Sequence, residues 1–402
     1  MLKISILGDV MSEPGLLRDT NQADGTYCYD PVFAPLKALL SQSDLVLANL
    51  ETPVAGEALG YSESIYSFNA PDALVKALQA IGVDAVSTAN NHAMDRGGAG
   101  FYATLDTLDR LGMPHTGTFR PGETADRNLY LTAGDLTVAV IAYTYGVNGI
   151  ISSGEKDGVA ADQINLLMVP EDKTPPPSSP KLKATVNLIQ ELTGYTMKWE
   201  DKIRLKSAMG IPIAYADEAF NQGSADKQLS LVQRDVKEAK KKADLVLFLP
   251  HVGGQFNTEP GAFTRYVVQK AREFGCDAVL AGHAHTTQRA EWQGDCPVYY
   301  SLGNVSMSSR TVYSQHQTLP QYGIISHLYV EEKRIVRSSY SLFCIVEEEN
   351  RPMRVVPVCD RYAALTDPGE KQLFLEELTR VTQRISGFSA AGEEVLREEY
   401  DL

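Results

Sequence analysis

The chain has 402 residues, 44% of them hydrophobic, which is enough to bury a large core in one big domain or two smaller ones. The formal net charge of −14 argues against general binding to nucleic acid or to an anionic membrane surface. No apolar run in the sequence approaches the ~20 residues needed to span a bilayer.

The five cysteines are odd in number and form no Cys-x-x-Cys pair, so we expect free thiols rather than ligands or a disulfide framework. The first strand is expected to begin at Leu2, which leaves no room for a signal peptide. A reduced, cytoplasmic location follows from both expectations.

Residues 1–150 alternate between strand and helix signals, as in α/β proteins. Helical spacing marks 71–78 and 100–111, and each of these segments adjoins a strand signal. The apolar run at 136–144 predicts a further strand, and a helix is expected at 228–242.

The alternation of strand and helix signals stops at 168–182, where Pro-Pro-Pro-Ser-Ser-Pro cannot continue a helix or a central strand. We interpret about 160–226 as an insertion with one or two helices between 183 and 226. It is either a lid over the strand ends or a peripheral decoration. Its place just after a predicted strand end favours the lid.

The pattern changes again after Asn304. Period-two alternation predicts a run of antiparallel strands, and an amphipathic helix closes the chain. We expect 1–345 to form one domain and 346–402 to pack on it as an extension. The predicted elements are strands at 322–331, 335–346 and 353–358 and a helix at 368–386.

Five short apolar runs end in polar groups that can bind metal. Such runs between helical stretches predict buried parallel strands, and sites collect at the carboxyl ends of such strands. We therefore expect these groups to converge on one edge of one sheet. Carboxylate, amide oxygen and imidazole suit borderline and hard divalent cations. The converging residues are Asp9, Glu51, Asn91, His92, His251, His283 and His285.

Each proposed ligand also has a plain structural interpretation. Asp9 could cap the next helix, Glu51 could be a solvated loop residue, and His251 could be a core histidine. His283 and His285 could be surface histidines. Four of only seven histidines end these runs, however, which favours metal ligation.

His92 and Asp95 are assigned to proton transfer. A histidine beside a ligating Asn91 can protonate a leaving oxygen while a carboxylate holds its other ring nitrogen. The alternative is that His92 only packs and Asp95 caps the following helix. Asn304 is expected either to contact the ligands or to form a turn, and not to bind metal itself. The remaining histidines are expected to be structural: His115, His316 and His327.

Other catalytic motifs are missing from the sequence. It contains no Gly-x-x-x-x-Gly-Lys-Ser/Thr, no Gly-x-Gly-x-x-Gly after the first strand and no Gly-x-Ser-x-Gly.

Six motifs, in this order along about 1–345, resemble the CapA family of poly-gamma-glutamate capsule biosynthesis proteins of the PgsA type. The family resembles calcineurin-like metallophosphoesterases, which implies an α/β fold with a four-layer α/β/β/α sandwich and a two-metal site. The motifs are Gly8-Asp9-Val10-Met11, Asn49-Leu50-Glu51, Asn90-Asn91-His92 with Asp95 and Gly97, His251-Val252-Gly253-Gly254, Gly282-His283-Ala284-His285 and Ser301-Leu302-Gly303-Asn304.

The resemblance implies one ion on Asp9 and His285, another on Asn91, His251 and His283, and Glu51 as the bridge. His92 would match the phosphoesterase histidine beside the leaving group.

Three positions depart from the family pattern. Met11 stands where a histidine ligand is usual, Glu51 replaces a bridging Asp, and Gln255 replaces a Glu. The first departure removes a ligand, so the sequence is compatible with one bound ion as well as with two.

Two functions are therefore expected. The first is a hydrolase in which one or two divalent ions (Mn, Zn, Fe or Mg) activate a water that attacks a phosphoester or a gamma-glutamyl-type amide. The second is a non-catalytic binding or assembly protein for an anionic polymer such as poly-gamma-glutamate. The partner in either case is a small or polymeric anionic substrate, not nucleic acid.

Overall fold

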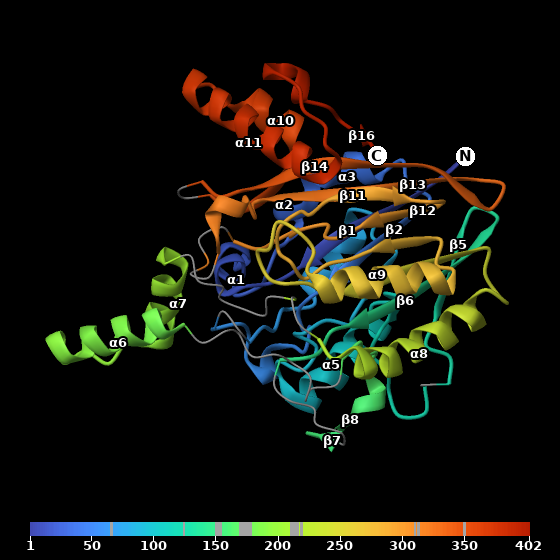
Figure 1. Cartoon of the computed structure of the whole chain (residues 1–402), viewed down its shortest axis with the longest axis horizontal. Helices are drawn as coiled ribbons and strands as arrows, with labels where there is room; N and C mark the ends of the chain where they lie inside the picture. The colour runs from blue at the N-terminus through green and yellow to red at the C-terminus, as the bar shows by residue number, and fades with distance from the viewer. Residues whose placement is uncertain are drawn as a thin grey trace.

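A computed structural model of the chain describes residues 1–64, 67–123, 125–148, 155–168, 179–209, 217, 220–308, 311, 314–348 and 351–402. The fold is mixed α/β, with two large sheets and helices packed outside them (Figure 1). Among the helices in the described ranges, none combines the length and apolarity that crossing a bilayer requires.

The first sheet is mixed, with β1 near its middle. β1 pairs in parallel with β2 and antiparallel with β13. The strands, in order across the sheet, are β15 (Arg354–Pro357), β14 (Arg334–Val346), β13 (Tyr322–Glu331), β1 (Leu2–Val10), β2 (Leu45–Leu50), β3 (Ala85–Ser87) and β4 (His115–Thr116), and β16 (Tyr400–Asp401) pairs with β14.

The second sheet has a parallel centre and antiparallel edges. Its strands, in order, are β11 (Ala290–Gln293), β12 (Cys296–Tyr299), β10 (Ala278–Leu280), β9 (Leu245–His251), β6 (Leu136–Thr144) and β5 (Leu129–Ala133). A separate small hairpin joins β7 (Glu155–Lys156) and β8 (Val159–Ala160).

The two sheets face each other across one core. Leu47 of β2 and Leu247 of β9 both lie in this central cluster, whereas their neighbours Val46 and Val246 point to the opposite faces. Successive side chains alternate across a strand, so both faces of β2 and β9 are buried and the strands read as continuous apolar runs.

Helices cover the outer face of each sheet. α4 (Ala73–Ala80) contributes Leu74 and Leu78 to the core outside the first sheet. α8 (Gln222–Ala239) and α9 (Ala262–Phe274) do the same for the second. The other helices on the first side are α1 (Pro14–Thr20), α2 (Asp30–Phe33), α3 (Lys37–Leu40) and α5 (Gly97–Arg110).

The C-terminal segment packs on this body. α11 (Pro368–Ser386) buries Phe374, Leu378, Val381 and Ile385 in the central cluster, and α10 (Val358–Ala364) precedes it. Short 3₁₀ turns lie at η1 (Ala34–Leu36), η2 (Glu57–Leu59), η3 (Ala161–Gln163), η5 (His316–Thr318) and η6 (Gly392–Val395).

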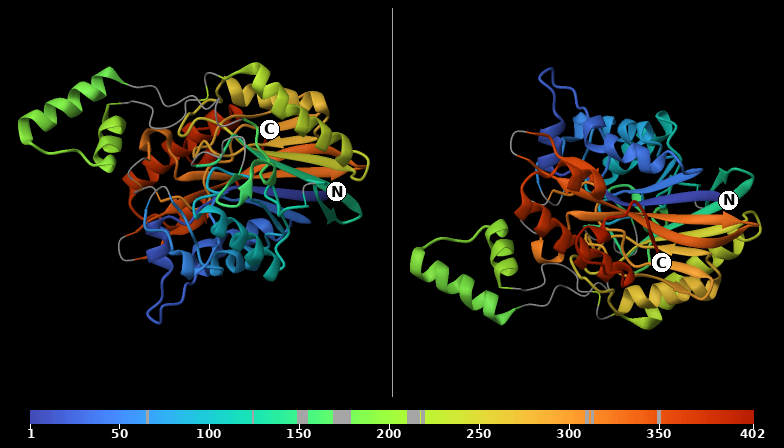
Figure 2. Two further views of the ribbon diagram at one scale, coloured as in Figure 1. Left: turned by 90° about the horizontal axis from the view of Figure 1, so that it is seen from below. Right: turned by 90° about the horizontal axis from the view of Figure 1, so that it is seen from above.

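The insertion carries two helices, α6 (Pro180–Thr193) and α7 (Trp199–Ala208). They project from the body and do not lie over it (Figures 1 and 2). Three parts of the predicted insertion, 169–178, 210–216 and 218–219, lie outside the described residues.

The predicted elements lie close to the observed ones, although several ends differ; the helix expected at 100–111, for example, is α5 and begins at Gly97. The expected single sheet is wrong, because β1, β2 and β3 lie in one sheet and β9 and β10 in the other. The helix expected at 228–242 begins at Gln222, because the Asn221 side chain caps it by accepting a bond from the Ser224 backbone N–H at 3.1 Å. That helix also ends three residues earlier, at Ala239.

Candidate metal centre

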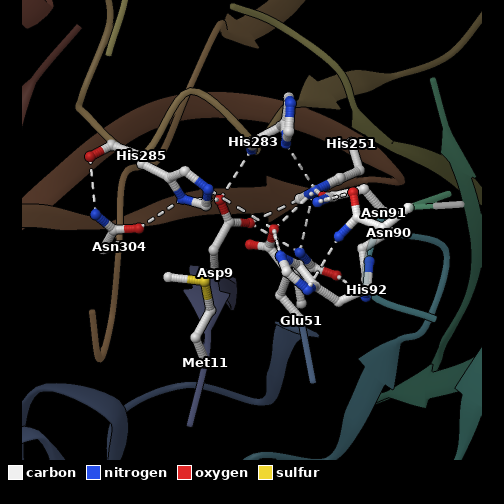
Figure 3. Close-up of polar contacts among 12 residues, drawn as sticks. Asp9, Met11, Glu51, Asn90, Asn91, His92, His251, His283, His285 and Asn304 are labelled. Carbon is white, nitrogen blue, oxygen red and sulfur yellow. Dashed lines mark hydrogen bonds and ion pairs between the residues drawn. The ribbon is translucent and has the colours of Figure 1, made fainter. Parts of the chain in front are cut away.

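The polar residues that end the apolar runs lie together although they come from both sheets (Figure 3). Asp9 is near the end of β1 and Glu51 follows β2, whereas His251 ends β9. Two parallel bridges, Asp9 with Asn304 and His251 with Gly282, hold the strand ends in register. The site is therefore formed where the carboxyl ends of two facing sheets meet.

One group of three side chains has the geometry to hold an ion. Ligand atoms of Glu51, His251 and His283 all lie within 4.8 Å of one another, and all three residues are buried. His251 Nε2 is 3.2 Å from Glu51 Oε1 and 3.1 Å from His283 Nδ1. Asn91 Oδ1 lies 2.7 Å from the same His251 nitrogen, so its amide oxygen adjoins this group.

A second group shares Glu51 with the first. Ligand atoms of Asp9, Glu51 and His285 also lie within 4.8 Å of one another. His285 Nδ1 is 3.7 Å from Asp9 Oδ2, and His285 Nε2 is 3.8 Å from Glu51 Oε1. The shared Glu51 carboxylate lies between two adjacent candidate ion positions.

The environment of the Glu51 carboxylate indicates whether a cation fits this site. Its side chain is 0% exposed, and neither carboxylate oxygen has a hydrogen-bond partner within the described part of the chain. A buried carboxylate without hydrogen bonds is costly, and a directly bound cation would offset that cost. Carboxylate, imidazole and amide oxygen together form a donor set for a divalent ion.

The charges inside the cluster are strongly coupled. Burial alone would raise the pKa of Asp9, but the hydrogen bond and charge of His251 lower it to about 2. Burial alone would lower the pKa of His251, but the charge of Glu51 and then the bond to Asp9 raise it to about 9. The two carboxylates thus favour the protonated form of His251, whereas metal ligation requires the neutral form.

The loop after β10 holds its two histidines in an unusual backbone conformation. His283 has φ 85° and His285 has φ 54°, values that L-residues seldom adopt. The His283 backbone N–H donates to Asp9 Oδ2 at 2.8 Å. This left-handed turn sends one ring towards each candidate ion position.

Two asparagines hold the ligands from behind. Asn49 Nδ2 lies 2.8 Å from Asp9 Oδ1 and 3.1 Å from His251 Nδ1. Asn304 Oδ1 accepts from His285 Nδ1 at 2.8 Å, and its Nδ2 donates to the His285 carbonyl at 2.8 Å. Such contacts fix ring orientation in metal sites.

His92 is positioned differently from the other histidines. Its Nδ1 lies 2.6 Å from Asp95 Oδ2, and its Nε2 lies 3.9 Å from Glu51 Oε1. Burial lowers the pKa of His92, but the Asp95 carboxylate outweighs burial and raises it. His92 thus lies at the edge of the cluster, with its ring held by Asp95.

Three residues at the site were given no role by the sequence analysis. The Phe68 ring stacks on His92 with centroids 4.2 Å apart, and Asn148 Nδ2 lies 3.2 Å from His92 Nδ1. The Asn148 backbone N–H also donates to the Asn91 carbonyl at 2.6 Å. The third is Asn49, and as the one polar residue inside the apolar run 45–50 it alone had a visible sequence signal.

Met11 lies beside Asp9 and is fully buried (Figure 3). Its backbone N–H donates to Ser306 Oγ at 3.0 Å, and the Ser306 hydroxyl donates to its carbonyl at 2.7 Å. These bonds hold the backbone of the segment in place.

The fold and the cluster together define a class: mixed α/β proteins whose facing sheets hold adjacent candidate metal positions. The chain belongs to the bacterial capsule synthesis protein PGA_cap family, whose profile matches residues 3–309. The expected membership of the CapA family is thereby confirmed.

Named relatives are distant. An uncharacterized protein, y4sH, of Sinorhizobium fredii is 23% identical over 286 residues, covering 69% of this chain and 61% of that protein. The PGA biosynthesis protein CapA of Bacillus subtilis is 22% identical over 324 residues, covering 80% and 67%. The chain thus matches less than two thirds of the first relative's length.

Among solved structures, a hypothetical protein from Thermus thermophilus is 17% identical and covers 85% of this chain and 98% of its own, with a TM-score of 0.44. That similarity is too low to define the fold.

Proposed function

We propose that the protein is a metal-dependent hydrolase that cleaves a phosphoester or a gamma-glutamyl-type amide. The observation that carries the proposal is the buried Glu51 carboxylate, shared by two ligand groups and without hydrogen-bond partners among the described residues. His92 lies next to it, held by Asp95.

Each residue has a stated role. Asp9 and His285 would hold one ion, and Asn91, His251 and His283 the other, with Glu51 between them. Bound there, divalent ions would acidify a water and stabilise negative charge that develops on the substrate. His92 would donate a proton to the leaving atom, and Asp95 would keep its Nδ1 protonated and its ring oriented.

We also propose a fold type and domain bounds for the chain. The facing sheets with helices outside are taken as the four-layer α/β/β/α sandwich of the metallophosphoesterase type. Residues 1–345 would form this domain, and 346–402 an extension packed on it. We place the protein in a reducing compartment such as the cytoplasm, which the five free cysteines support.

A second function is favoured by the names of relatives. The Bacillus subtilis protein is named for PGA biosynthesis, and the family for capsule synthesis. A binding or assembly role towards an anionic polymer such as poly-gamma-glutamate would keep the ligand groups without turnover.

The experiment separates these two functions. Purified protein is stripped of metal, reloaded with manganese, and assayed on phosphodiesters, phosphomonoesters and gamma-glutamyl peptides, with Glu51→Gln as the matched variant. Hydrolysis that follows metal content and disappears in E51Q supports the hydrolase. Polymer binding with no turnover on any of these substrates would favour the assembly role.

A further inference from the structure

The C-terminal helix α11 brings a cation against the loop that carries His285. Arg384 Nη1 donates to the Thr318 carbonyl at 2.7 Å and to Thr286 Oγ1 at 3.3 Å. Thr286, fully buried, directly follows His285 in the chain. The Arg384 guanidinium therefore contacts the residue that directly follows the proposed ligand His285.

The Arg384 guanidinium is only partly hydrogen-bonded. Its Nε and Nη2 are buried and have no hydrogen-bond partner among the described residues. Burial, and then the charge of Arg380, lower the pKa of Arg384 to about 10, while Glu259 opposes this. Burying a cation costs free energy, and Arg384 makes one hydrogen bond to Thr286 in the His285 loop and one to the Thr318 carbonyl.

Those bonds continue to the ligand. The Thr286 hydroxyl donates to the Thr318 carbonyl at 2.8 Å, which ties the His285 loop to the 316–320 segment. From the other side, Asn304 Nδ2 donates to the carbonyls of His285 at 2.8 Å and Pro320 at 3.4 Å. The left-handed turn at His285 is thus clamped between Asn304 and Arg384, and Figure 3 shows the Asn304 side of this clamp.

We propose that Arg384 is a positioning residue that sets the affinity of the ion position formed by Asp9, Glu51 and His285. The inference rests on the proposed function only in requiring that these residues bind metal. Because α11 lies outside the family-matched residues 3–309, the Arg384 side of this clamp comes from the C-terminal segment.

The test isolates one position at a time. His283→Ala removes a ligand from the first group, so manganese binding to metal-free H283A reports the Asp9–Glu51–His285 position. Adding Arg384→Met should weaken that binding by about 10- to 100-fold, the usual effect of losing a contact behind a ligand. In a His285→Ala background, which leaves the other position, Arg384→Met should leave affinity unchanged.

Two further variants separate positioning from general stability. Arg380→Met removes an exposed cation one turn earlier, whose hydrogen bond goes to the Gln317 carbonyl at 3.3 Å, and should leave both affinities unchanged. Arg384→Lys keeps a donor for Thr318 and should restore most of the lost affinity. Thr286→Val combined with Arg384→Met should weaken binding by much less than the product of the two single effects.

Equal weakening in the two backgrounds, or no weakening in H283A, overturns the inference. Metal binding by the unaltered chain without any hydrolysis defeats only the hydrolase proposal, and the inference stands. If the unaltered chain binds no metal, the candidate centre itself fails.

Discussion

The ring of Phe68 stacks on the imidazole of His92, with centroids 4.2 Å apart and planes inclined by 23°. The Phe68 backbone N–H also donates to Asp95 Oδ2 at 2.7 Å, and this oxygen is the one that contacts His92 Nδ1. One residue therefore orients both members of the proposed acid pair. Tyr145 also lies against His283, with centroids 4.4 Å apart but with planes inclined by 37°.

His92→Ala should separate acid catalysis from ligation. Metal content and thermal stability should stay nearly unchanged, and turnover should fall by about 10²- to 10⁴-fold, the usual yield of one general acid. The loss should be smallest for substrates with good leaving groups, which need no proton. Metal analysis and steady-state kinetics check both parts.

Two histidine variants serve as controls for that experiment. His283→Ala should lose activity together with the ion of its own group, while the Asp9–Glu51–His285 group keeps its ligands. His115→Ala, whose ring contacts the Met113 carbonyl at 3.1 Å, should change neither. If H92A strips the metal, His92 is a ligand and the proton donor is another residue.

Phe68→Leu should reduce turnover by about 10-fold while metal content stays constant, because the backbone bond to Asp95 survives and only the stacked ring is lost. Phe263→Leu, a change in the outer core of the second sheet, should lower thermal stability alone. Unchanged turnover in F68L would show that Asp95 suffices to hold His92.

Metal titration of the stripped protein should show two unequal affinities, or one site only. Thioether suits soft metals, so Met11 contributes no useful ligand to the ion beside Asp9. Met11→His should raise the metal affinity of the weaker position. Met11→Leu should leave the metal affinities of both positions unchanged. Two equal, tight sites in the unaltered chain would mean that another residue fills the gap.

His327 should make stability pH-dependent far from the metal centre. It is buried between Ser5 Oγ, 2.8 Å from Nδ1, and Ser341 Oγ, 3.0 Å from Nε2. Burial, and then the charge of Lys3, lower its pKa from 6.5 to about 3. Between these values the unfolded chain binds one more proton than the folded one, so stability falls as the pH falls.

The contribution of His327 is thus full above pH 6.5 and is lost as the pH drops towards 3. The slope from this one group should approach about 1.4 kcal/mol per pH unit. His327→Gln keeps polar atoms for both serines and cannot titrate, so chemical denaturation between pH 5 and 7 should show a flatter profile. An identical slope in both proteins would contradict the assignment.

Local pattern was enough to place most of the elements. The strand expected at 136–144 is β6 with the same bounds, and the helix expected at 368–386 is α11. Continuous apolar runs identify buried strands whatever their neighbours, and caps and periodicity act over a few residues. The seven polar residues at run ends were found for the same reason.

Only the tertiary structure decided which strands share a sheet. β2 and β9 have both faces buried, so their sequences carry no mark of the sheet to which they belong. Strand pairing depends on hydrogen bonds between residues far apart in the chain, such as those between β1 and β13.

The same non-local packing set the details of the site. Glu51 is shared by two ligand groups because two sheet edges meet there. Phe68 and Asn148 contact His92, and Arg384 contacts Thr286, from segments with no motif of their own. The sequence by itself determined which side chains stand at the strand ends. Folding decided which of them touch and what holds them, because those contacts join residues brought together only by the packed core.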